Sequence, residues 1–349
     1  MKKIVGILAA AAVLATSVFA AEVSAGVRLA GSLFNYDGTD VSALKLTHEN
    51  QFYHAPIAFS ISDDKAGGTL KLTDKARGNG DDDIDDQLAK KAEPAKASQA
   101  LVTSSAWQIW FKPVDALKLT FGCYKNTLNQ ESIGWYRSDS GIGDDGGAQG
   151  SYVATIAPVD GVSVDLLFGN TFGSPWFNGA DNSVAEFGLM FKYSADFGTI
   201  GALFDAKDTF KDLKFGASFA GSADAISYWI NVLGYYKEEF TKVRAELFGA
   251  YSQDALSLKL FVPFNFNVGA TGANAQIDLG AVFRLDYAMD SITVYLEAAD
   301  NDFLADDFSM SIKPGIKANV GCCAIDLGVN IGASSKVTID VPLELKVTF

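Results

Sequence analysis

Histidine, cysteine and positive charge are all scarce in this chain of 349 residues, which holds only two histidines and three cysteines. His48 and His54 lack zinc-protease spacing and a third ligand, so we interpret them as loop or strand-end residues. Cys322 and Cys323 are adjacent at a predicted turn and Cys123 is predicted on an outward face, so no disulfide framework is expected. With 28 Lys and Arg against 42 Asp and Glu, the net charge of −14 disfavours a nucleic-acid partner.

Long apolar runs are missing from the chain after its first 20 residues. No later segment approaches the ~20 apolar residues that a membrane-spanning helix needs. At the amino terminus, two lysines precede an Ala-rich apolar stretch, and Val18 and Ala20 place small side chains before a cleavage site. We therefore expect residues 1–20 to be a secretory signal peptide cleaved after Ala20, rather than an uncleaved membrane anchor.

What the mature chain does contain is a sustained alternation of apolar and polar residues. Every second residue of 337–349 is apolar, and the same pattern recurs in segments such as 276–287 and 256–266. Short turns rich in Gly, Pro, Asp and Ser alternate with longer connections. The sequence predicts an all-β fold, a single transmembrane antiparallel up-and-down β-barrel over 21–349. An even count of about 18 strands is expected, with 16 to 20 left open because 41–73 is ambiguous.

Aromatic residues recur at one position in this pattern, as the last apolar residue before a short turn. They are Phe111, Tyr193, Phe219, Tyr251 and Tyr287. Rings at such positions form the interfacial girdle of membrane barrels, whereas the alternative is that aromatics are simply good strand formers. We predict a girdle on the periplasmic side.

Two segments resemble known proteins. Leu343, Leu345, Val347 and the terminal Phe349 resemble the carboxy-terminal signature by which bacterial outer-membrane barrels are recognised for assembly. The segment 107–122 is similar in style to strand-turn-strand segments of spirochaete outer-membrane barrel proteins. The resemblance implies a porin-like barrel that is exported through the periplasm to the bacterial outer membrane. Its implied partners are outer-membrane lipid and the barrel-assembly machinery, and it implies no catalytic residue.

Charged side chains lie mainly on the polar faces of the predicted strands. A charge that faces lipid at mid-bilayer costs ~2–4 kcal/mol, so we expect these residues to point into a water-filled lumen. The predicted pore-lining residues are Arg28, Lys118, Asp165, Glu186, Lys192, Lys214, Arg244, Glu246, Lys259, Asp278, Arg284, Glu297, Lys317, Asp326, Asp340 and Glu344. Barrels of 16–18 strands leave an aqueous channel. The sequence therefore predicts passive diffusion of small hydrophilic solutes, and the oligomeric state is left open.

Two long loops carry acidic clusters that we expect at the mouth of the pore. One holds Asp81, Asp82, Asp83, Asp85 and Asp86, and the other holds Asp139, Asp144 and Asp145. Carboxylates near a permeation path select cations, so a weak cation preference is predicted.

Neither acidic loop matches a known ligand site in full. The first lacks the Gly and Glu of a calcium-binding EF-hand, and 141–146 matches a dinucleotide fingerprint only by letter, because a strand follows it. No metal and no cofactor is predicted. The alternative function is a structural or adhesive barrel that is plugged by loop 74–100 or 125–149 and acts through its surface loops. An outer-membrane hydrolase is disfavoured by the few histidines, so no enzyme activity is predicted.

Overall fold

The computed structural model describes most of the chain. The described residues are 20–43, 57–74, 102–129, 140–144, 150–170, 185–207, 210–237, 240–268, 276–300, 302–305 and 309–348. Residues 1–19 of the predicted signal peptide 1–20 and the five aspartates of 81–86 lie outside them. No helix in this described part is long and apolar enough to cross a membrane.

One sheet of 21 strands contains nearly all of the described structure, and a separate pair of strands accompanies it. The sheet consists of β1 (Ala20–Tyr36), β2 (Val41–Ala43), β3 (Ile57–Ser62), β4 (Ala66–Asp74), β5 (Val102–Val114), β6 (Leu117–Gly122), β9 (Gly150–Ile156), β10 (Val162–Asn170), β11 (Ala185–Ala195), β12 (Gly198–Lys207), β13 (Asp212–Ala223), β14 (Ile226–Lys237), β15 (Phe240–Gln253), β16 (Leu256–Val268), β17 (Gln276–Leu279), β18 (Ala281–Met289), β19 (Ile292–Asp300), β20 (Met310–Val320), β21 (Cys323–Gly328), β22 (Asn330–Ala333) and β23 (Val337–Thr348). The separate pair is β7 (Tyr124–Thr127) and β8 (Gly141–Asp144).

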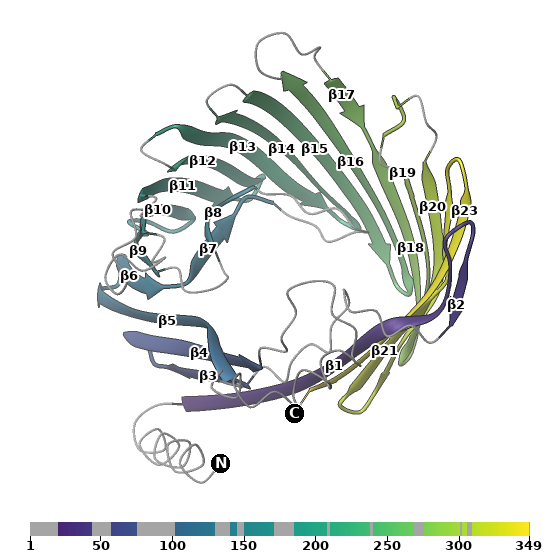
Figure 1. Cartoon of the computed structure of the whole chain (residues 1–349). Helices are drawn as coiled ribbons and strands as arrows, with labels where there is room; N and C mark the ends of the chain where they lie inside the picture. The colour runs from purple at the N-terminus through teal and green to yellow at the C-terminus, as the bar shows by residue number, and fades with distance from the viewer. Residues whose placement is uncertain are drawn as a thin grey trace, which may run out of the picture.

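The sheet strands pair antiparallel in a ring (Figure 1). β1 pairs with β23 on one side, with Gly26 opposite Thr348, and with β3 on the other, with Ala20 opposite Ser62. The ladder of pairings thus returns to its first strand. β2 and β3 both pair with β1, β17 and β18 both pair with β16, and β21 and β22 both pair with β23. Counted with one wall position for each of these three sets, the described residues form about 18 wall positions, an even count that bacterial barrels favour. The predicted all-β barrel is confirmed.

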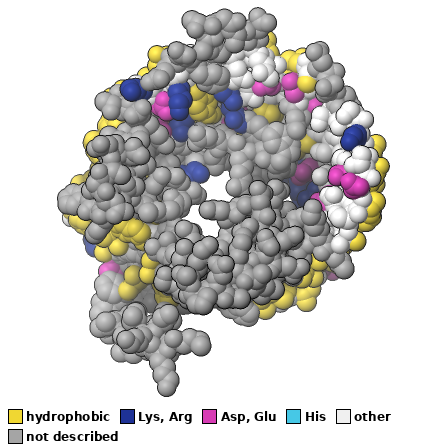
Figure 2. All heavy atoms as spheres, viewed as in Figure 1, with side chains coloured by type: hydrophobic (Ala, Val, Ile, Leu, Met, Phe, Trp, Pro, Cys, Tyr) yellow, Lys and Arg dark blue, Asp and Glu magenta, His cyan; other side chains and the backbone are white. Residues whose placement is uncertain are grey.

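Strand alternation gives the wall two different faces. On β14, Ile230 and Val232 are exposed on the outer surface, whereas Asn231 and Leu233 between and beside them are fully buried. Figure 2 shows hydrophobic side chains along much of the outer rim of the ring, and most of the visible charged side chains lie inside that rim, along its upper and right-hand parts. An apolar outer face and a polar inner face suit a barrel with lipid outside and water inside.

Local polar contacts fix the short turns. The backbone N–H groups of Ala66 and Lys65 donate to Asp63 Oδ1 at 2.6 and 2.7 Å, and they hold the pKa of this carboxyl below its usual range. Lys65 also pairs with Asp115 in the next short turn, which raises the pKa of the lysine and lowers that of the aspartate. The neighbouring β3–β4 and β5–β6 turns are therefore joined by an ion pair at the barrel end.

Candidate channel and its inner hairpin

The chain leaves the barrel wall at the end of β6. Gly122 has a φ of +109°, and a Cβ there would lie 2.3 Å from the carbonyl oxygen of Trp107. Only glycine adopts this conformation without strain. The next residue, Cys123, donates its N–H to the same carbonyl at 2.7 Å, and its side chain is buried. The prediction that Cys123 faces outward is wrong, because strand alternation stops at Gly122 where the chain turns inward.

β7 and β8 form a hairpin inside the ring (Figure 1), which we call the inner hairpin. Thr127 on β7 lies opposite Gly141 on β8, and Tyr124 lies opposite Asp144. The sequence predicted an acidic loop at the outer mouth here. Asp144 instead belongs to a strand within the lumen, while Asp139 and Asp145 lie outside the described residues. The segment turns inward because its apolar side chains are removed from water when they pack on the inner wall.

Those apolar side chains are Leu128 and Ile142, which are only 5% and 0% exposed. They pack on inward side chains of the wall that we call the hairpin seat: Val153, Leu167, Met190, Leu203 and Leu233. Burial of a leucine or isoleucine side chain stabilises a fold by ~1.5–3 kcal/mol. The inner hairpin is therefore attached to one side of the wall by packing.

Three glycines give the hairpin seat its depth. A Cβ at Gly201 would lie 2.8 Å from Leu128 Cδ2, and one at Gly188 would lie 3.1 Å from Ile142 Cβ. A Cβ at Gly216 would lie 3.4 Å from Leu128 Cδ1. Glycine usually weakens a strand, and here it marks the close approach of another segment. β11, β12 and β13 thus form a shallow hollow that the inner hairpin fills.

Hydrogen bonds fix the inner hairpin at its base. Tyr124 Oη and Asn126 Nδ2 both donate to Asp165 Oδ2 on β10, at 2.6 and 2.5 Å. Lys192 Nζ on β11 donates to Asn126 Oδ1 at 2.8 Å. Asp165 is buried, and a buried carboxylate is tolerated only with such partners.

A second set of polar contacts lies at the end of β7. Asn231 Nδ2 on β14 donates to the Asn129 carbonyl oxygen at 2.7 Å and to Glu246 Oε2 at 2.9 Å. Arg244 Nε lies 2.6 Å from Glu246 Oε1 in a buried ion pair. The inner hairpin is thus bound to the wall at both of its described ends.

The opposite wall carries a network of charges that we call the charged ladder: Arg284, Asp286, Tyr295, Glu297, Lys317 and Asp326 on β18 to β21. Arg284 Nε donates to both carboxylate oxygens of Asp286 at 3.0 Å, and its Nη1 donates to Glu297 Oε2 at 3.1 Å. Its guanidinium lies 4.4 Å from the Tyr295 ring centroid. Tyr295 Oη donates to Asp326 Oδ1 at 2.8 Å. The ladder is therefore internally paired.

Glycines also shape the charged ladder. A Cβ at Gly315 would lie 2.3 Å from Tyr295 Cζ, and one at Gly328 would lie 2.9 Å from its Oη. The Tyr295 ring therefore lies flat across β20 and β21. The side chains of Lys317 and Asp326, whose Nζ and Oδ2 are 3.5 Å apart, remain 46% and 31% exposed. Part of this wall is thus open to water.

The structure places the predicted pore-lining residues at different depths on the wall. Asp165, Lys214, Arg244, Glu246 and Glu297 are buried, Lys118, Lys192, Lys259, Asp278, Arg284, Asp326, Asp340 and Glu344 are half-buried, and Lys317 is exposed. Nothing is described of the side chains of Arg28 and Glu186. Lys214 Nζ lies 3.4 Å from Asp205 Oδ2, so this lysine belongs to a second buried ion pair.

The predicted girdle residues lie on strands that lead into short turns. Phe111 and Tyr287 are 42% and 50% exposed, and Tyr193, Phe219 and Tyr251 are half-buried. The ring centroids of Tyr193 and Phe197 are 6.1 Å apart, as are those of Phe219 and Tyr228. Of the assembly signature, Leu343, Leu345 and Val347 lie on β23, and Phe349 lies outside the described residues. Both roles stay predictions.

Sequence reasoning missed the hairpin seat and a second apolar cluster on the inner face. Trp229, Phe248 and Phe261 occupy positions where alternation predicts polar residues, and the centroid of Trp229 lies 5.4 Å from that of Phe248. A signal for the seat was present. The pairs Leu166-Leu167 and Leu189-Met190 interrupt the alternation, which indicates that both faces of the wall are covered there.

No family model and no curated protein matches the chain. Solved structures share its fold. A BenF-like porin from Pseudomonas fluorescens is 9% identical with a TM-score of 0.56, covering 94% of this chain and 98% of that one. OccK9 of Pseudomonas aeruginosa is 11% identical with a TM-score of 0.52 and coverage of 94% and 98%. Vibrio cholerae OmpT lacking loop L8 is 10% identical with a TM-score of 0.51, covering 95% and 100%. The chain thus has the fold of bacterial outer-membrane β-barrels.

Proposed function

We propose that this protein is a porin-like channel of the bacterial outer membrane through which small hydrophilic solutes diffuse passively. The observation that carries the proposal is the asymmetric lumen. The inner hairpin is attached to the wall at β10–β14, while the charged ladder on β18–β21 keeps side chains open to water. An attached hairpin narrows a channel on one side without needing to close it.

The paired charges of the wall support passive passage rather than strong selection. Arg284 is held by two carboxylates, and Lys317 faces Asp326. Paired charges of opposite sign supply water-compatible lining with little net field. We assign the weak cation preference to the acidic residues 81–86 together with Asp139, Asp144 and Asp145, because rings or clusters of carboxylates select cations.

The proposal extends to export and assembly. Residues 1–20 are removed as a signal peptide, so that β1 of the exported chain begins at Ala21, one residue after the first residue of β1 in the full chain. The outward residues of β23 and the terminal Phe349 engage the barrel-assembly machinery. The similarity of 107–122 to strand-turn-strand segments of spirochaete outer-membrane barrel proteins suggests that the chain is a protein of that kind. Subunits of this fold can also form homo-oligomers.

The test is the ion conductance of the purified mature chain in a planar lipid bilayer. The expected result is discrete current steps of uniform size with no requirement for an energy source. Folding is checked in the same sample by the shift in gel mobility on heating. A folded, heat-modifiable protein that gives no steps would contradict the channel. In that case the inner hairpin would act as part of a plug, which favours the structural or adhesive barrel.

A further inference from the structure

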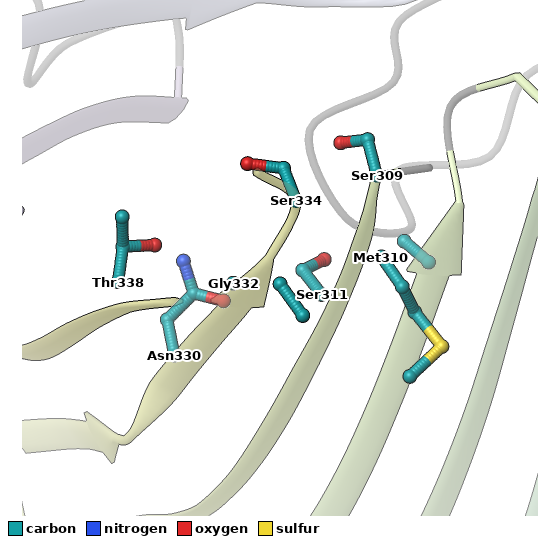
Figure 3. A pocket seen from close by; sticks show the side chains of 9 residues that line it. Ser309, Met310, Ser311, Asn330, Gly332, Ser334 and Thr338 are labelled. Atoms are coloured by element: carbon teal, nitrogen blue, oxygen red, sulfur yellow. The ribbon is translucent and has the colours of Figure 1, made fainter. Parts of the chain in front are cut away.

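A recess lies on the inner wall between β19, β20, β22 and β23 (Figure 3), with a volume of about 270 Å³. Five of its described lining side chains are hydroxyls or an amide: Ser309, Ser311, Asn330, Ser334 and Thr338. The other described lining residues are small or apolar, and none of the described set carries a charge. The recess is therefore polar and neutral, unlike the charged ladder on the same side of the lumen.

The polar groups of the recess are available to a ligand. Within the described part of the chain, the side chains of Ser309, Ser311, Asn330 and Thr338 make no hydrogen bond, and Ser334 makes a long one of 3.4 Å to the Lys336 carbonyl. In Figure 3 the Ser309 hydroxyl points toward Ser334, and the Thr338 hydroxyl points toward Asn330. Hydroxyls and amides each donate and accept hydrogen bonds, so this set suits a ligand that does both.

A glycine holds one side of the recess open. A Cβ at Gly332 would lie 2.4 Å from Thr338 Oγ1 and 3.8 Å from Thr338 Cβ. Any larger residue at this position would therefore displace the threonine hydroxyl. Gly332 and Thr338 are paired across β22 and β23, so the position of this hydroxyl is fixed by strand register.

The recess lies at the end of the barrel where β19 ends, β20 begins and the short turn between β22 and β23 is found. Ser309 directly precedes β20 and Ser334 directly follows β22. The β20–β21 turn, in contrast, lies at the other end of these strands. A solute that enters from the end with the long connections would therefore meet the recess before it reaches the middle of the wall.

We infer that the recess is an entrance site for neutral polyhydroxylated solutes of about monosaccharide size, an inference that rests on the proposed channel for delivery of the solute. Sugar hydroxyls match the mixed donors and acceptors of the lining. An ionic solute would lose hydration there without gaining an opposite charge. The volume is below the ~300–1,000 Å³ of pockets for drug-sized ligands, so a single sugar ring fits better than an oligomer.

Glucose is the probe for two independent measurements. Saturation-transfer NMR on the refolded chain in detergent micelles reports binding without any need for conduction. Partial block of the ion current by glucose in a planar bilayer reports binding within the channel. The test variants are Ser311→Ala, which keeps the wall packing, and Gly332→Ala, which displaces the Thr338 hydroxyl. Ser163→Ala on β10, across the lumen, is the matched control.

Glucose should bind the wild-type chain saturably, and each test variant should weaken binding about two- to tenfold, as expected for the loss of one hydrogen bond. Ser163→Ala should bind as wild type. Equal binding by all variants, no saturable binding, or equal binding of lysine or glutamate would overturn the inference. A chain that binds glucose in micelles but passes no current refutes the channel and leaves the site standing. A chain that conducts ions but does not bind glucose refutes the sugar site and leaves the proposed channel standing.

Discussion

The two sides of the lumen wall are built from the same kind of strand and yet differ in what covers them. At β10–β15 several inward residues are buried on the side that holds the inner hairpin, and Leu233 on β14 and Glu246 on β15 are both fully enclosed. At β18–β21 the inward residues form the charged ladder, and Lys317 remains 46% exposed. An inward position therefore does not by itself define a pore-lining residue. A charged residue at an inward position contributes to stability where another segment packs over it, and it can contribute to permeation where it stays exposed to water.

The largest effect expected from this difference is on conductance. Replacement of residues 124–144 by a short Gly-Ser link should remove the inner hairpin and widen the lumen. Single-channel conductance should rise roughly two- to fourfold, since a barrel of this strand number otherwise holds an open aqueous channel. A matched control is Leu128→Met with the hairpin retained, which should conduct as wild type. Unchanged conductance after the replacement would show that the hairpin does not limit the bore.

The second expected effect is a difference in stability: breaking an ion pair should lower the free energy of unfolding more in the covered wall than in the open wall. Arg244→Gln removes one partner of a pair whose side chains are 10% and 0% exposed, which should lower the free energy of unfolding by about 3–5 kcal/mol. Lys317→Gln removes the cation of an open pair and should cost at most about 1 kcal/mol. Urea titration of the protein in lipid vesicles measures both. Similar losses for the two variants would mean that the walls are equally covered.

The third effect compares the inner face with the outer face. Leu258 and Ser257 are adjacent on β16, opposite Leu285 and Asp286 of β18. Leu258→Arg places a charge against lipid and should cost ~2–4 kcal/mol in vesicles, whereas Ser257→Arg on the lumen side should cost much less. The same urea titration gives the difference. If the serine variant lost as much stability as the leucine variant, the assignment of faces would be wrong.

The fold was predictable from the sequence because alternation is a local property. On β23 every second residue from Val337 onward is apolar, and both strand and face follow from that. The inner hairpin was not predictable in the same way. Its position depends on Leu128 and Ile142 meeting glycines from three distant strands, and pattern reasoning assigns no partner to such residues. The interrupted alternation at Leu166-Leu167 indicated a covered face without showing what covers it.

The smallest expected effect is on ion selectivity, and it tests whether the charged ladder borders the path of ions. Lys317→Gln removes one positive charge and leaves Asp326 and its neighbours in place. The reversal potential in a salt gradient should therefore shift toward cations. The shift should be clear at ~0.1 M salt, where the Debye length is about 10 Å, and nearly lost at ~1 M, where it is about 3 Å. Lys118→Gln on β6, a half-buried lysine whose Nζ lies 4.7 Å from the Trp110 ring centroid, is the matched control on the other part of the wall. A larger shift for Lys118→Gln than for Lys317→Gln would place the ion path along the opposite wall, and a shift that persists at high salt would point to a rearranged lumen rather than to a lost charge.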